Sequence, residues 1–229
     1  MSKMMHYSLK TFENLKKSIQ RREGLLPFDF LGRTLAYNPY VPRALVSDLA
    51  RDGKIAKKCF NYPAFSYERL SFVIDLDSEF IMVDFRTTYE ENILGAGDFD
   101  CLTQLRRYSQ KFIIHNDIFL NEYQILESCI YGSDCIVLDA EILGKDLASM
   151  CEFAIRLALI PIVKITSLKN LKSAIFAKAQ VFYITQDFSN LIASVPNSKI
   201  ILCDLPSDVS ELDEKSSYGV DMFFVQALD

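Results

Sequence analysis

The sequence predicts an α/β fold, a (β/α)8 TIM barrel preceded by an N-terminal helical extension. Eight apolar runs follow one another along the chain, and most are separated by segments with the spacing of amphipathic helices. The stretch from Lys111 to Asp139 reads as strand, helix and strand joined by short turns, which indicates parallel strands with a right-handed crossover. No glycine-rich phosphate loop follows any strand, so the pattern favours a barrel over an open dinucleotide-binding sheet.

The N-terminal part is predicted to be a helical brace. Apolar residues recur at helical spacing within residues 8–23, with Ser8 as a possible N-cap and Gly24 as the stop. Residues 26–51 place three prolines among aromatic side chains, which indicates an ordered apolar segment followed by a short helix at Pro42 to Arg51. We expect this segment to act as a lid or brace on the barrel.

The barrel itself is predicted from alternating strand and helix patterns. The expected strands cover residues 54–60, 79–85, 111–115, 135–138, 161–165, 181–185, 199–203 and 221–225. The expected helices cover residues 99–108, Asn121 to a stop at Gly132, 146–158, 168–179 and 209–218. Strand one is expected to end at Asn61–Tyr62–Pro63, the helix after strand six is shortened, and no helix is expected after strand eight.

Composition supports one cytoplasmic domain. No Pro/Gly/Ser-rich linker divides the 229 residues, so residues 1–53 are taken as the brace and 54–229 as the barrel of a single unit. Six cysteines without a CxxC pair fit buried thiols better than disulfides or zinc. The longest apolar stretch, around Ala154 to Val163, is broken by Arg156 and Pro161, so no membrane span or signal peptide is expected. A net charge of −5 without a basic block argues against nucleic acid. No cofactor is expected.

Four stretches carry a resemblance to a known family. Residues 26–51, 121–138, 195–202 and 218–225 resemble indole-3-glycerol-phosphate synthase, in the family's order and close to its spacing. The resemblance implies a (β/α)8 barrel. It also implies a tryptophan-biosynthesis activity, in which a carboxyphenylamino-deoxyribulose phosphate is closed and decarboxylated. The chemistry depends on residues at the carboxyl ends of the strands, which must be compared one at a time.

The positions that the resemblance assigns to catalysis carry other residue types. On strand one, AKKCFNYPA matches the family's AEIKxxSPS, which puts Lys57 at a glutamate and Cys59 at a lysine. On strand three, Asn116 stands where the family has its general-acid lysine, and an amide has no titratable proton to give. On strand five, Lys164 stands at a glutamate.

The substrate and phosphate positions are changed as well. Thr185 and Asp187 match the family's Asn and Arg after strand six, and Asp204 follows strand seven. Phosphate binding needs free backbone N–H groups and a positive field, which prolines and carboxylates do not provide. The residues aligned with the phosphate-binding positions are Ala64, Leu205, Pro206 and Gln226.

The sequence therefore favours a degenerate synthase, a pseudoenzyme with a protein-interaction or regulatory role and an unidentified protein partner, and it argues against binding of a phosphorylated substrate. Residual synthase activity is one alternative. A second alternative is altered chemistry at an acidic mouth formed by strand-end aspartates beside His115. The members of that mouth would be Asp84, Asp117, Asp139, Asp187 and Asp204.

For several of these residues, a structural interpretation stands beside the functional one. A divalent metal held by His115, Asp117, Asp139 and Asp204 is a weak alternative, because side chains alternate along a strand and several of these point away from the lumen. Cys59 reads as a nucleophile or as a buried filler, and His115 as a base or as a structural residue. The segment from Phe28 to Tyr40 reads as a partner surface or as packing retained from the family.

Overall fold

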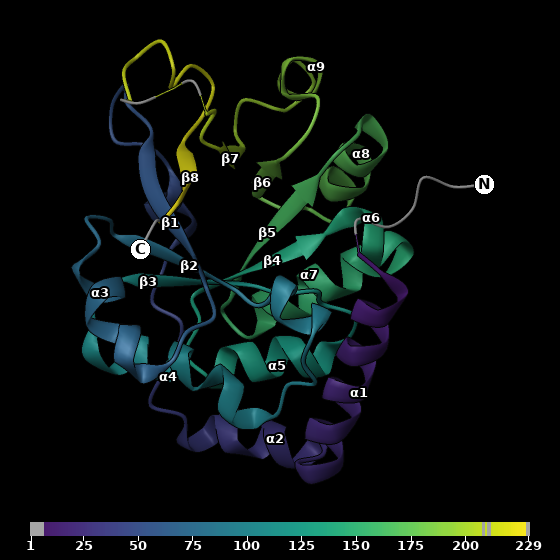
Figure 1. Ribbon diagram of the computed structural model, residues 1–229. Helices are drawn as coiled ribbons and strands as arrows, with labels where there is room; N and C mark the ends of the chain where they lie inside the picture. The colour runs from purple at the N-terminus through teal and green to yellow at the C-terminus, as the bar shows by residue number, and fades with distance from the viewer. Residues whose placement is uncertain (1–6, 208, 210–211, 228–229) are drawn as a thin grey trace.

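The computed structural model describes residues 7–207, 209 and 212–227, and it forms a closed barrel of eight parallel strands (Figure 1). Each strand pairs with the next in sequence, and β8 closes the barrel by pairing with β1. This confirms the predicted fold class. The strands are β1 (Lys57–Pro63), β2 (Phe80–Asp84), β3 (Phe112–Asn116), β4 (Cys135–Asp139), β5 (Ile160–Ile165), β6 (Val181–Ile184), β7 (Ile200–Asp204) and β8 (Met222–Gln226).

The strands form because apolar side chains can be buried on both of their faces. All five residues of β2 and all six of β5 are buried, which is typical of parallel strands covered by helices. Alternate residues pack into two different cores: one set fills the barrel interior and the other faces the surrounding helices. The interior set includes Cys59, Met82, Ile114, Val137, Ile162, Tyr183, Leu202 and Phe224.

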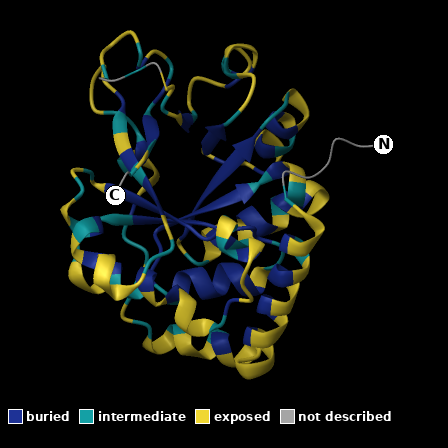
Figure 2. Ribbon diagram, in the orientation of Figure 1, coloured by how far each residue is buried: buried dark blue, intermediate teal, exposed yellow. Residues whose placement is uncertain are grey.

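The helices lie around the barrel, mainly beside β2 to β6 (Figure 1). The longest of the helices that connect consecutive strands is α7 (Leu147–Arg156). Helix α5 (Glu122–Ile130) is largely buried between the strands and the N-terminal helices (Figure 2). No helix in the described part of the chain is long and apolar enough to cross a membrane. The helices that follow the strands are α3 (Leu70–Asp75), α4 (Asp100–Tyr108), α5 (Glu122–Ile130), α6 (Ala140–Leu143), α7 (Leu147–Arg156), α8 (Leu168–Phe176) and α9 (Phe188–Ile192). Short 3-10 turns occur at Tyr67–Arg69, Arg86–Glu90, Ala96–Phe99 and Gly144–Asp146.

The N-terminal segment packs across this shell. It contains α1 (Leu9–Leu25), α2 (Phe28–Thr34) and the 3-10 turns η1 (Leu35–Tyr37) and η2 (Val46–Leu49). Ser8 caps α1 as predicted, since its Oγ accepts a hydrogen bond from the Thr11 amide at 3.1 Å. The predicted stop at Gly24 is wrong by one residue, because α1 runs to Leu25.

The helix predicted over Pro42 to Arg51 is only the 3-10 turn η2. The backbone amide of Arg43 donates to the carboxylate of buried Asp134 at 2.6 Å, and this contact takes the segment away from a helical path. In contrast, the N-cap predicted at Asn121 is confirmed by its hydrogen bond from the Gln124 amide.

The predicted strands agree with the observed ones to within one residue at each end, except for strand one, and the last predicted helix also differs. Strand β1 begins at Lys57 and runs through Asn61 and Tyr62 to Pro63. Asn61 pairs with both β2 and β8, Tyr62 pairs with β2, and both side chains are buried. The predicted helix at 209–218 lies partly outside the described residues, and its described part has turns at 214–219 instead. The short helix after strand six is confirmed as α9, which has five residues. The absence of a helix after strand eight concerns residues beyond Ala227, which lie outside the described residues.

Candidate functional site at the barrel mouth

Eight side chains form a ring at the carboxyl end of the barrel. Each lies two residues beyond one of the eight interior residues named above, and therefore points to the same side of its strand. Because the carboxyl ends of parallel strands meet at one end of a barrel, these side chains surround the mouth. We call them the mouth ring: Asn61, Asp84, Asn116, Asp139, Lys164, Thr185, Asp204 and Gln226.

Two charged pairs occupy one half of this ring. Lys164 Nζ lies 3.0 Å from Asp139 Oδ2 on the adjacent strand, with both side chains mostly buried. Arg86, in the turn after β2, folds back on Asp84 with its Nη2 2.6 Å from Oδ2 and its Nε 2.9 Å from Oδ1. Burial opposes the charge of Arg86, but Asp84 more than offsets this, so the pKa of the guanidinium lies above its ordinary value. Both cations are therefore neutralised by a neighbouring carboxylate.

Arg86 also holds Asn116. With the Asn116 amide turned so that its oxygen faces the guanidinium, Oδ1 accepts from Nε and Nη2 of Arg86 at 3.2 Å. Asn116 is 1% exposed, so its amide is enclosed by this contact and by the neighbouring strands. Arg86 was not predicted as a site residue. The available signal was its place two residues after a carboxylate that ends a strand.

The other half of the ring carries negative charge. Asp204 is exposed and accepts a 2.7 Å hydrogen bond from the Tyr183 hydroxyl. Burial and the nearby Asp204 charge raise the pKa of Tyr183, so its hydroxyl stays a neutral donor. Asp187, just beyond the ring, has a left-handed backbone and accepts from Asn190 Nδ2 at 2.6 Å. Thr185 Oγ1 is buried and has no hydrogen-bond partner within the described ranges.

The backbone amides at three strand ends are already used. The Leu205 amide donates to Phe224 O at 2.9 Å, the Ala227 amide to Asn61 O at 3.1 Å, and the Ala64 amide to Asp84 O at 2.9 Å. Pro206 has no amide hydrogen to give. The loops after strands one, seven and eight therefore have few free donors at these positions.

Strand one contributes different residues to the mouth than the sequence alignment suggested. Lys57 lies at the amino end of β1, at the opposite end of the barrel, where its Nζ pairs with Asp52 at 3.1 Å and Glu79 at 3.4 Å. Cys59 is fully buried one layer below the mouth, and burial raises the pKa of its thiol. This fits the filler reading of Cys59 rather than a nucleophile. Asn61, which the sequence analysis did not select, is the β1 side chain in the ring.

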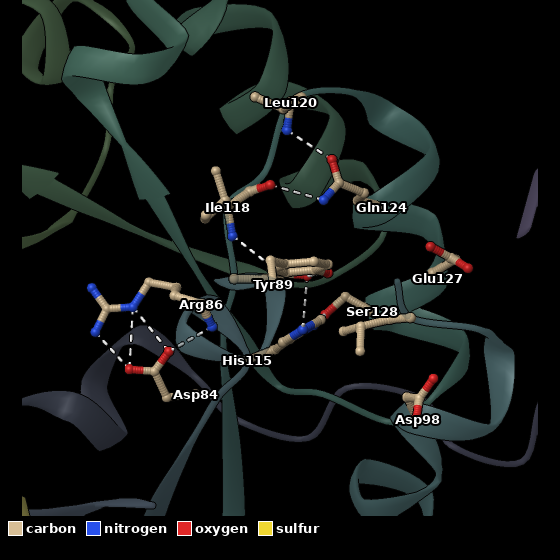
Figure 3. A network of polar contacts seen from close by, with 12 residues as sticks. Asp84, Arg86, Tyr89, Asp98, His115, Ile118, Leu120, Gln124, Glu127 and Ser128 are labelled. Carbon is tan, nitrogen blue, oxygen red and sulfur yellow. Dashed lines mark hydrogen bonds and ion pairs between the residues drawn. The ribbon is translucent and has the colours of Figure 1, made fainter. Parts of the chain in front are cut away.

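His115 and Asp117 lie outside the barrel wall. His115 is the outward neighbour of Asn116, and its Nδ1 lies 3.0 Å from Ser128 Oγ on α5. Phe85, Phe99 and Phe119 contact its ring edge to face. Figure 3 shows the two groups apart, with Arg86 folded against Asp84 and His115 directed to Ser128.

Asp117 accepts from the Tyr89 hydroxyl at 3.0 Å and lies 3.6 Å from His115 Nε2. The proposed acidic mouth with His115 as its base is therefore wrong in its geometry, because strand alternation turns the histidine away from the lumen. The weak metal set is also divided, since His115 and Asp117 lie in the outer layer while Asp139 and Asp204 face the mouth. Across residues 7–207, 209 and 212–227, no three His, Cys, Asp or Glu side chains come together as metal ligands.

An eight-stranded parallel barrel with a polar mouth at its carboxyl end and a helical N-terminal brace defines the class of (β/α)8-barrel proteins. The sequence profile described as indole-3-glycerol phosphate synthase matches residues 90–211. A Campylobacter jejuni protein named indole-3-glycerol phosphate synthase is 33% identical over 94% of this chain and 92% of its own length. Proteins of the same name from Campylobacter curvus and Sulfurimonas denitrificans are 33% and 29% identical over 92% of this chain, and 88% of each of those proteins is covered. This chain belongs to the indole-3-glycerol phosphate synthase family.

Proposed function

We propose that this chain is a catalytically inactive member of the family that has kept the fold and lost the reaction. The observation that carries the proposal is the state of Asn116, at the position that the resemblance assigns to the general acid. Its amide cannot release a proton at any ordinary pH, and it is enclosed by Arg86, whose own charge is neutralised by Asp84. Loss of a catalytic acid alone costs about 10²–10⁴ in rate.

Two further features of the mouth support the same proposal. Lys164, at a position that carries a glutamate in the family, is paired with Asp139 and so supplies neither a carboxylate nor a free ammonium. The phosphate positions Ala64, Leu205, Pro206 and Gln226 offer occupied amides, a proline and a neutral side chain. A phosphate dianion would also meet the negative charge of Asp187 and Asp204. Binding energy that would position a phosphorylated substrate is therefore missing as well.

The experiment is a direct synthase assay. Purified chain is incubated with the carboxyphenylamino-deoxyribulose phosphate, beside the Campylobacter jejuni relative as the positive control, and formation of indole-glycerol phosphate is followed. We expect no turnover above the rate without protein, and no rise in melting temperature with millimolar inorganic phosphate. Turnover that scales with protein concentration would establish residual synthase activity, the alternative reading, and would overturn the proposal.

The role that replaces catalysis is proposed to be binding of a protein partner through the brace. Within residues 28–45 of the brace, four large apolar side chains are strongly exposed, namely Phe30, Tyr37, Val41 and Leu45, with Tyr37 at 90%. Exposed apolar residues grouped along one segment are common at protein interfaces. The test places a photo-crosslinking amino acid at Tyr37 and, as the matched control, at exposed Phe176 on α8. We expect a discrete adduct in cells from position 37 and none from 176, whereas equal labelling at both would contradict the proposal.

A further inference from the structure

A pocket of about 300 Å³ opens beside the negative half of the mouth ring. It lies where β6 runs into α9 and where the chain leaves β7 and returns to β8. Figure 1 shows this side of the molecule covered by α9 and loops, without the long helices that cover β2 to β6. Its volume is at the lower end of the range for small-molecule sites.

The walls of this pocket are apolar. They include Phe188, Cys203, Val220 and Phe223, of which the last three belong to one small buried cluster that Phe188 also contacts. Burial raises the pKa of the Cys203 thiol to about 12, so this side chain is neutral at physiological pH. The walls can therefore hold an apolar body but contribute no charge.

The rim of the pocket is negative. Asp187 and Asp204 both line it, and each accepts a hydrogen bond from a neutral group, the Asn190 amide or the Tyr183 hydroxyl. Neither carboxylate has an ion-pair partner among the residues that the structure describes, although Asp84 and Asp139 across the mouth each have one. Because the donors are neutral, the two negative charges are not compensated locally.

A third polar group completes the lining. Thr185 contributes to the pocket, and its buried Oγ1 has no hydrogen-bond partner in the described part of the protein. The pocket thus combines an apolar floor with two carboxylates that have no ion-pair partner among the described residues.

We propose that this pocket binds a small organic cation, an ammonium or guanidinium group carried on an apolar body. The carboxylates of Asp187 and Asp204 would hold the cationic head, and the walls around Phe188 and Phe223 would bury the body. The inference rests on the proposed loss of phosphate binding, because it assigns the opposite ligand charge to the same end of the barrel. An anionic ligand would have to overcome the repulsion of both carboxylates.

The chain offers a direct reporter for this binding. It contains no tryptophan, so Phe188→Trp introduces a single fluorophore into the pocket wall, and Phe176→Trp on α8 introduces one at a distant exposed position as the control. The probes are phenethylammonium chloride, neutral 2-phenylethanol with a similar body, and inorganic phosphate. Binding is followed by fluorescence of both variants and by the thermal shift of the unmodified chain.

We expect saturable binding of phenethylammonium that changes the fluorescence of Phe188→Trp and leaves Phe176→Trp unaffected. The Asp187→Asn/Asp204→Asn double variant should weaken this binding by about 2- to 30-fold, since each of the two ion pairs near a protein surface contributes roughly 0.2–1 kcal/mol. The exposed residues Glu90 and Glu152 provide the matched control, because Glu90→Gln/Glu152→Gln removes the same total charge away from the pocket and should leave the affinity unchanged. Each variant is used only if its unliganded melting transition matches that of the parent.

The remaining outcomes separate this inference from the proposed function. Equal affinity for 2-phenylethanol, or undiminished binding to the Asp187→Asn/Asp204→Asn variant, would overturn the role of charge. Absence of phenethylammonium binding together with absence of phosphate binding would overturn the cation site and leave the loss of the phosphate site standing. Saturable phosphate binding would overturn both.

Discussion

The buried ion pair between Arg22 and Glu127 gives a sharp test of how the brace is held on the barrel. Arg22 on α1 meets Glu127 on α5 with its Nε 2.9 Å from Oε1 and its Nη2 3.1 Å from Oε2. The two side chains are 1% and 5% exposed. The guanidinium also donates to Leu94 O at 3.3 Å and stacks over Phe99 at 4.6 Å.

Replacing Arg22 with methionine leaves a buried carboxylate without its cation. Removing one partner of a buried pair destabilises proteins by about 3–5 kcal/mol, because the remaining charge loses its compensation. For a chain of this length, about 2–4 °C in melting temperature accompanies each kcal/mol, so Arg22→Met should lower it by about 6–20 °C. Urea unfolding followed by circular dichroism measures the free-energy difference directly.

The double variant Arg22→Met/Glu127→Met is the matched control. It removes the uncompensated charge, so it should be less destabilised than Arg22→Met alone. If Arg22→Met lies within about 1 kcal/mol of the parent, or if the double variant is less stable than the single one, the reasoning about the buried charge is refuted.

The same variant carries a pH dependence with a defined sign. Burial raises the pKa of Glu127, and Arg22 opposes this shift in the parent. Without Arg22, the pKa of the Glu127 carboxyl should rise further above its unfolded value. A carboxyl with a raised pKa in the folded state favours folding below its unfolded pKa and loses that contribution as pH rises through the folded value. The stability gap between Arg22→Met and the parent should therefore narrow as the pH is lowered from 7.5 toward 4.5.

Three other predictions follow from particular contacts. Burial raises the pKa of Cys101 and Cys129 to about 11 and that of Cys151 and Cys203 to about 12. At pH 8 these thiols should therefore react with Ellman's reagent at least about 100-fold more slowly in the native chain than in the urea-unfolded chain. Fast labelling of the native chain would contradict their burial. Gly132→Ala should lower the free energy of unfolding in urea by about 1–3 kcal/mol, because Gly132 has a φ of +95° and an added Cβ would lie 2.9 Å from Arg106 Cγ. Gly24→Ala is the control inside α1: its added Cβ meets nothing within 4 Å, so this variant should raise the free energy of unfolding by about 0.5–1 kcal/mol. Lys164→Met should lower the melting temperature by leaving Asp139 unpaired, while exposed Lys169→Met should not, and equal effects of the two variants would argue against the mouth pair.

The strand order and most of the mouth could be predicted from the sequence, because buried parallel strands appear as continuous apolar runs. Ile162 and Val163 point to opposite faces of β5, yet both are apolar, since each face is covered. The run ends where a polar residue such as Lys164 reaches the mouth. The same rule placed Asp139 and Asp204 at the mouth, whereas Asn116 was singled out by the family resemblance.

Strand one was misplaced because its local signals conflict with its environment. Lys57 and Lys58 look unlike a buried strand, and Pro63 looks like a terminator. In the structure Lys57 extends to Asp52 and Glu79 at the amino end of the barrel, and Pro63 needs no amide hydrogen at the last position of β1. Glu79 lies 22 residues further along the chain, just before β2, so a pattern local to strand one does not contain this contact.

The side-chain direction of His115 and the role of Arg86 were missed for a related reason. A shift of one residue along β3 separates Asn116 in the mouth from His115 among the phenylalanines, and sequence spacing alone does not fix that parity. Arg86 belongs to a turn without periodicity. Its importance arises because its side chain returns to Asp84 and reaches Asn116 on the next strand.

The two faces of each strand also explain how the fold can be kept under the proposed loss of the reaction. Outward residues such as His115 and Val83 pack against several elements, so substitutions there disturb the shell that holds the barrel together. The charged contacts at the mouth are single pairs, so a charge introduced there needs only one compensating neighbour. Lys164 forms an ion pair with Asp139, and Arg86 forms one with Asp84, so both cations are accommodated without altering the packed layers. Substitutions in the ring are therefore restrained chiefly by function. Under the proposed loss of the reaction, the mouth can change its charge while the brace, the helices and the strands remain.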